Sequence, residues 1–122
     1  MPTEPAPTTL SEVVRRAVEI CEPDGLSGDM ERFMLEFEDR DEPISSVEDL
    51  PGEMNTALER GAEGVIDPGL RMAAAITTYL GFRRDQITDD DVEIMRLAAR
   101  AEWEGHVPDD VARWLGEQGV TL

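Results

Sequence analysis

The segment Asp67–Phe82, DPGLRMAAAITTYLGF, is the least charged stretch of a highly charged chain. Between Pro68 and Gly81 its only charged residue is Arg71. A helix that is apolar nearly all round is a buried helix, and crossing a membrane would need about 20 apolar residues. We therefore expect a central helix at about 68–80. Its apolar residues fall on two stripes of a helix: Leu70, Ala73, Ala74 and Thr77, and Met72, Ile76 and Tyr79.

Both ends of this segment carry residues that are typical of helix ends. The carboxylate of Asp67 can cap the first free backbone N–H groups, and Pro68 suits the first helical position because no N–H partner is lost there. Gly81 can adopt the left-handed conformation that closes a helix, with Phe82 folded back over the last turn. These residues predict where the central helix begins and ends.

The rest of the chain also shows helical rather than strand periodicity. No run alternates apolar and polar residues with the two-residue period of a half-buried strand. Thr9 with Glu12, and Ser45 with Glu48, match capping boxes, and Thr88 is a third expected cap. The fold class is therefore all-α, a compact bundle of five to six helices around the central one. Besides the central helix, we expect helices at about 10–21, 27–40, 51–60, 89–104 and 108–118, and a short helical turn at 46–50.

The length of 122 residues predicts one domain that buries a substantial core. Residues 1–8 contain three prolines and no periodic pattern, so we expect a disordered tail before a single all-helical domain at 9–122. Cys21 is the only cysteine and lies on an apolar helix face, which predicts a buried thiol. No charged stretch leads into a hydrophobic run at the N-terminus, and we expect a cytoplasmic protein.

The charge balance is the strongest global feature of the sequence. The chain has 28 acidic and 11 basic residues, a net charge of −17, and every basic residue is arginine. Such a surface repels nucleic acids and anionic membranes, so we expect neither direct nucleic acid binding nor membrane binding. It attracts basic proteins, but it also suits solubility or a salt-rich cytoplasm. The sequence does not separate these roles.

Residues that could perform chemistry are few. The run Asp89–Asp91 is the densest carboxylate cluster, but consecutive residues at a helix start diverge, and the helix dipole there opposes a cation. His106 is the only histidine and falls at a hinge between two predicted helices. No serine or cysteine lies in a nucleophile motif, and no glycine-rich phosphate loop is present. We therefore expect no catalytic residue, no cofactor and no metal.

Four residues are candidates for binding. Trp103 and Trp114 are of a type enriched in interface hot spots, although packing between the last two helices would also explain them. Arg83 and Arg84 follow the central helix, where a helix-turn-helix protein would contact phosphates. The three aspartates that open the next helix would repel phosphates, so salt bridges to neighbouring acids are the alternative for both arginines.

The sequence favours a small acidic helical protein that acts as a protein–protein interaction or regulatory module. The expected partner is another protein, with a basic one as an option, or a second copy of the chain that meets an apolar patch along the last two helices. Two alternatives stay open. One is a nucleic-acid-mimicking inhibitor of a basic protein, with carboxylates concentrated on one face. The other is a small enzyme or carrier whose carboxylate-lined pocket includes Tyr79 or His106.

Overall fold

The computed structural model describes residues 8–23, 25, 28–61, 67–83 and 89–120, and within these ranges the chain is helical with no strand. The predicted all-α class is confirmed, and all of the predicted tail except Thr8 lies outside the described residues. The elements are α1 (Leu10–Cys21), α2 (Gly28–Glu36), the short 3₁₀ helix η1 (Ile44–Ser46), α3 (Leu50–Gly61), α4 (Pro68–Phe82), α5 (Asp91–Trp103) and α6 (Asp109–Glu117).

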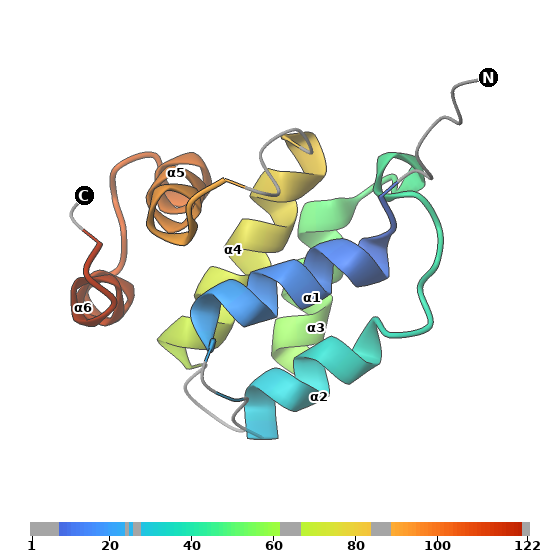
Figure 1. The fold of residues 1–122 in the computed structure, drawn as a ribbon, viewed down its shortest axis with the longest axis horizontal. Coiled ribbons are helices and arrows are strands. Elements are labelled where there is room, and N and C mark those ends of the chain that lie inside the picture. The colour runs from blue at the N-terminus through green and yellow to red at the C-terminus, as the bar shows by residue number, and fades with distance from the viewer. Residues whose placement is uncertain (1–7, 24, 26–27, 62–66, 84–88, 121–122) are drawn as a thin grey trace.

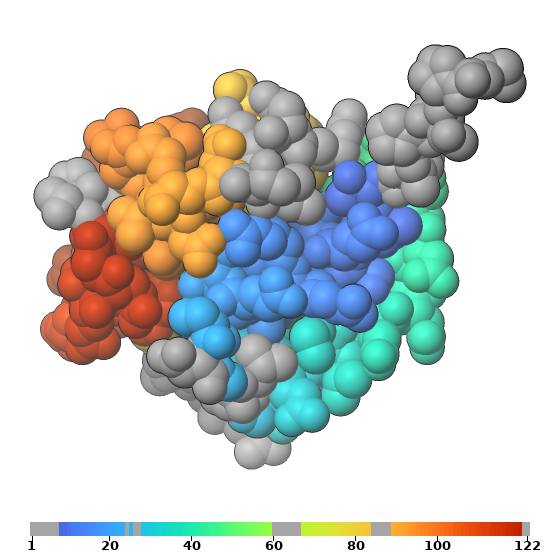
Figure 2. Space-filling model, viewed as in Figure 1, coloured from blue at the N-terminus to red at the C-terminus, as the bar shows by residue number. Residues whose placement is uncertain are grey.

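Helix α4 is the centre of the fold, as the sequence predicts. It packs against α1, α2, α3, α5, α6 and η1 (Figure 1). In the space-filling view α4 is almost hidden behind α1 and α5 (Figure 2). Its one buried polar side chain, Thr77, is satisfied because the hydroxyl donates to the Ala73 carbonyl at 2.9 Å. The amphipathic neighbours therefore bury their apolar faces against one apolar helix.

The predicted start of α4 is confirmed, and the predicted end is wrong. The Asp67 carboxylate accepts the Gly69 N–H at 3.0 Å, and Pro68 is the first helical residue. At the other end the helix continues through Gly81 to Phe82, which is 73% exposed instead of folded back. A Cβ at Gly81 would clash with the side chain at the start of α3. The glycine thus permits close approach between two helices and does not make a left-handed turn.

The connector between α2 and η1, residues 37–43, is held by the backbone N–H groups at the N-terminus of α1. The first N–H groups of a helix have no partner within the helix. Here the Leu10 and Ser11 N–H groups donate to the carbonyls of Glu42 and Arg40, each at 3.0 Å. The Thr9 hydroxyl accepts the next N–H at 3.1 Å, as predicted. These bonds hold the connector beside α1 and place Arg40 and Glu42 near α3.

Aspartates cap α3 and α5. The Asp49 carboxylate accepts an N–H in the first turn of α3 at 3.2 Å, and Asp90 does the same for α5 at 3.3 Å. Ser45 is the expected cap of a helical turn at 46–50, but the 3₁₀ turn spans Ile44–Ser46, and α3 begins at Leu50, directly after Asp49. Thr88, the other expected cap, lies outside the described residues.

We predict that the thiol of Cys21 is unreactive in the folded protein. Its side chain is 3% exposed, and burial raises the pKa of the thiol, with nearby carboxylates acting in the same direction. Because the thiolate is the nucleophile, an aromatic disulfide reagent should react slowly in native buffer and rapidly in denaturant. As a control, Leu35→Cys in a Cys21→Ala background should react rapidly in native buffer. Rapid reaction of native Cys21 would contradict the buried placement.

Candidate functional site: a groove between α2 and α3

Two adjoining hollows run along α2 and α3. Their volumes are ≈ 340 and ≈ 410 Å³, and both are lined by Glu36 and Ala57. Because they share these walls, we treat them as one feature, the α2–α3 groove. Its charged lining residues are Asp29, Arg32, Glu36, Arg40, Asp49 and Glu53.

The inner wall of the α2–α3 groove is apolar. Phe33 of α2 and Phe37, the first residue after α2, are four positions apart and are almost fully buried. Their ring centroids are 5.5 Å apart with an interplanar angle of 67°, the edge-to-face arrangement that aromatic pairs favour. Ala57 of α3 and Leu70 of α4 are the buried apolar residues opposite them. Ala57 lines both hollows.

An arginine held by two carboxylates closes one end of the groove. The Arg40 guanidinium donates to both carboxylate oxygens of Glu42 at 2.9 Å and to Glu53 of α3 at 3.0 Å. The hydrogen bond from Arg40 lowers the pKa of Glu42, and the same pairing raises the pKa of Arg40. Charge-assisted bidentate pairs are the stronger kind of surface contact. The cluster thereby ties the connector to α3.

The lowered pKa of Glu42 predicts a pH-dependent contribution to stability. A carboxylate with a lowered folded-state pKa stabilises the fold above its unfolded pKa, and this contribution disappears as the pH falls through the folded value. Glu42→Gln should therefore lower stability at neutral pH, and the difference from the parent should shrink on acidification. Urea denaturation across a pH series measures this, with Glu38→Gln, which changes an exposed carboxylate in the turn after α2, as control. A difference that grows in acid would contradict the prediction.

The rim of the α2–α3 groove is negative overall. Its arginines already have carboxylate partners, because Arg40 contacts Glu53 and Arg32 lies 3.7 Å from Asp29. Leu35, which is 52% exposed, adds an apolar side chain beside these charges. The groove thus combines an apolar interior with a surplus of carboxylates at its edges.

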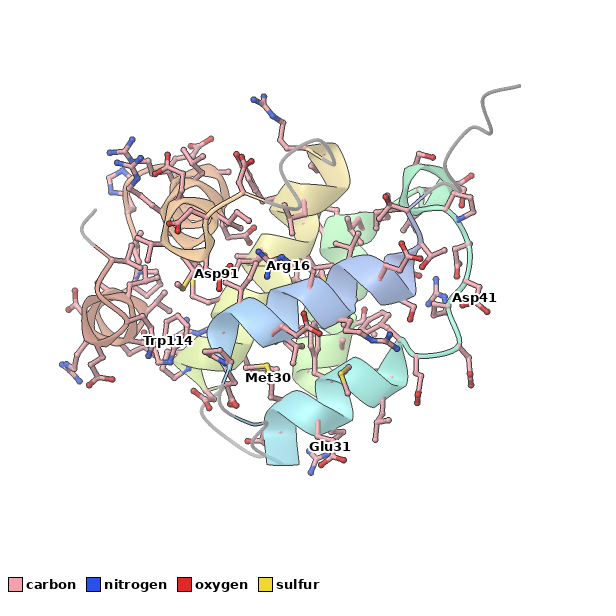
Figure 3. All side chains as sticks on the ribbon, viewed as in Figure 1. Arg16, Met30, Glu31, Asp41, Asp91 and Trp114 are labelled. Atoms are coloured by element: carbon pink, nitrogen blue, oxygen red, sulfur yellow. The ribbon has the colours of Figure 1, made fainter. Side chains whose placement is uncertain are left out.

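The predicted tryptophans lie elsewhere, against different turns of α4. Trp114 points from α6 toward α4 (Figure 3), and its indole is so close that a Cβ on Gly69 would lie 3.1 Å from its Nε1. Trp103 is half-buried and lines a hollow of ≈ 120 Å³ together with Arg71 and Thr78. Both tryptophans are partly buried and pack against the core, and their role in binding stays a prediction.

Arg83, the described one of the two predicted arginines, does not line the groove either. Arg83 is exposed at the end of α4, and Arg84 lies outside the described residues. The groove residues Phe33, Phe37 and Arg40 were not predicted as a site. The apolar stripe of the second helix identifies the two phenylalanines as inward-facing, and they are 3% exposed, but no local signal reveals that hollows lie beside them between α2 and α3.

The aspartates at the start of α5 have structural roles. Asp90 caps the helix, and the Asp91 carboxylate accepts from the Arg16 guanidinium of α1 at 2.8 Å (Figure 3). Arg16 also donates to the Asp89 carbonyl at 3.3 Å. Among the residues that the structure describes, no group of three or more His, Cys, Asp or Glu side chains is arranged to hold a metal ion.

Comparison with family models, with curated proteins and with solved structures gives no match to this chain. Within the described ranges, none of the helices combines the length and the apolar character that crossing a membrane requires.

Proposed function

We propose that the protein is a protein–protein interaction module whose α2–α3 groove binds a basic, amphipathic helical segment of a partner. The observation that carries this proposal is the apolar inner wall, with Phe33 and Phe37, beneath a carboxylate-rich rim. Helix-in-groove recognition uses this combination, because the apolar face of the ligand helix is buried while its flanks stay polar. Lysines or arginines on those flanks would meet Glu36 and Asp49.

The overall charge should raise the association rate of such binding and its selectivity for basic partners. A net charge of −17 produces a field that attracts basic partners and repels acidic ones before contact. The apolar contacts then determine which basic partner stays bound. The affinity should fall with rising salt without disappearing, because salt screens the electrostatic contribution to binding but does not screen the apolar contacts.

Fluorescence anisotropy with labelled model peptides tests the proposal. The probe is a helical peptide with leucine and phenylalanine at i, i+3, i+4 and i+7 and lysines on both flanks. A scrambled peptide of the same composition keeps the charge but lacks the apolar face, so it should bind at least about tenfold more weakly, a difference of about 1.4 kcal/mol. Equal binding of the two peptides would contradict a groove and indicate charge attraction alone.

A matched pair of lysine variants locates the binding surface. Glu36→Lys changes the rim of the groove, whereas Glu31→Lys makes the same charge change at an exposed position of α2 outside it (Figure 3). We expect Glu36→Lys to weaken the probe peptide about tenfold and Glu31→Lys to have a much smaller effect. Similar losses in both variants would argue for a diffuse field and against the groove.

The two alternatives draw less support from the described residues. Exposed carboxylates occur on α1, α2, α3, α5 and α6, and a nucleic acid mimic would concentrate them on one face. A carboxylate-based enzyme was expected to bring acids together with Tyr79 or His106. His106 is exposed after α5, and the groove that gathers carboxylates is lined by neither residue.

A further inference from the structure

A hollow at the C-terminal end of α4 has an exposed apolar side chain at its edge. It measures ≈ 210 Å³ and lies where the last turn of α4 meets η1 and the start of α3. Ile44 and Leu50 in its wall are buried. Phe82 forms part of the edge, and at 73% exposure it is the most exposed large apolar side chain that the structure describes. An apolar hole and an apolar projection therefore lie side by side on one surface.

The charges around this hollow are of both signs. Glu48 is exposed and lines the hollow, and Arg83, which directly follows Phe82, is exposed as well. A basic partner of the kind proposed for the α2–α3 groove would be repelled by Arg83. This surface carries both the apolar projection and the hollow that can receive it, so it can bind the same surface of a second copy. In a two-fold interface the same patch of both copies is used, and each residue of the patch contacts a different residue of that patch in the other copy.

We infer that a second copy of this chain docks here, with Phe82 of each copy inserted into the hollow of the other. The same two-fold operation places Arg83 of each copy opposite Glu48 of the other copy. The interface then contains two equivalent pairs of opposite charge. The inference does not depend on the α2–α3 groove, because the two sites share no lining residue, although both include the start of α3. Because the net charge of each copy is −17, the association is measured at an ionic strength that screens their mutual repulsion.

Sedimentation velocity of the full chain over a wide concentration range tests this dimer. We expect a reversible, concentration-dependent dimer that Phe82→Ala abolishes and that Val92→Ala, a similar truncation at another exposed apolar residue, leaves unchanged. Because Phe82 is exposed, its truncation should leave the helical circular dichroism intact. A monomer at every concentration would overturn the inference, and so would a dimer that persists in Phe82→Ala.

A charge exchange tests the geometry of the pairing. Arg83→Glu and Glu48→Arg should each weaken self-association about tenfold or more, because each places like charges opposite one another. An equimolar mixture of the two variants should regain dimers, since both contacts across the mixed interface are then complementary. Failure of the mixture to associate more strongly than either variant alone would overturn the two-fold pairing.

Discussion

Replacing Ile76 by alanine is expected to lower the free energy of unfolding by about 3 kcal/mol, within the range of about 2–5 kcal/mol typical of such core truncations. Ile76 is fully buried near the middle of α4, the helix that packs against all the other described helices. The truncation removes apolar contacts and leaves a cavity that rigid neighbours fill only partly. Since small domains are stable by about 5–15 kcal/mol, this loss is a large fraction of the total.

Urea denaturation followed by circular dichroism measures this loss, and Leu35→Ala is a matched control. It removes a side chain of the same size, but Leu35 is 52% exposed on α2. We expect the control to change stability by less than about 0.5 kcal/mol, as for most surface substitutions. Similar losses at the two positions would mean that α4 is not the centre of the core.

The success of the sequence prediction for α1 and for the start of α4 follows from strong local signals. Asp67 and Pro68 fix the start of α4 within the chain itself, and Thr9 does the same for α1. The apolar periodicity of α1 then agrees with its capping residue, so its bounds are those predicted. Local agreement between cap and periodicity is sufficient to place a helix without any knowledge of its neighbours.

The failures share a different cause, which is contact between segments that are distant in the chain. Gly81 looks like a helix stop, but its role is set by the start of α3 packed against it. The partner of Arg16 in α1 is Asp91 of α5, which lies far away in the chain and which no local pattern indicates. The α2–α3 groove belongs to the same group, because its existence depends on how α3 lies beside α2.

Enlarging a buried alanine of α4 should destabilise the protein even though it adds apolar surface. Ala73 is fully buried, and interiors packed as closely as crystals have no room for three further carbon atoms. We expect Ala73→Leu to lower the free energy of unfolding by about 1–3 kcal/mol through displaced neighbours.

The same substitution at an exposed alanine separates this packing effect from helix propensity. Ala101 lies on the exposed side of α5, and leucine and alanine differ little in helix propensity, so Ala101→Leu should change stability by less than about 0.5 kcal/mol. If Ala73→Leu instead stabilised the protein, α4 would face a void or solvent at this turn. If both Ile76→Ala and Ala73→Leu lower the stability, the core around α4 tolerates neither smaller nor larger side chains. This is the behaviour expected of a close-packed central helix.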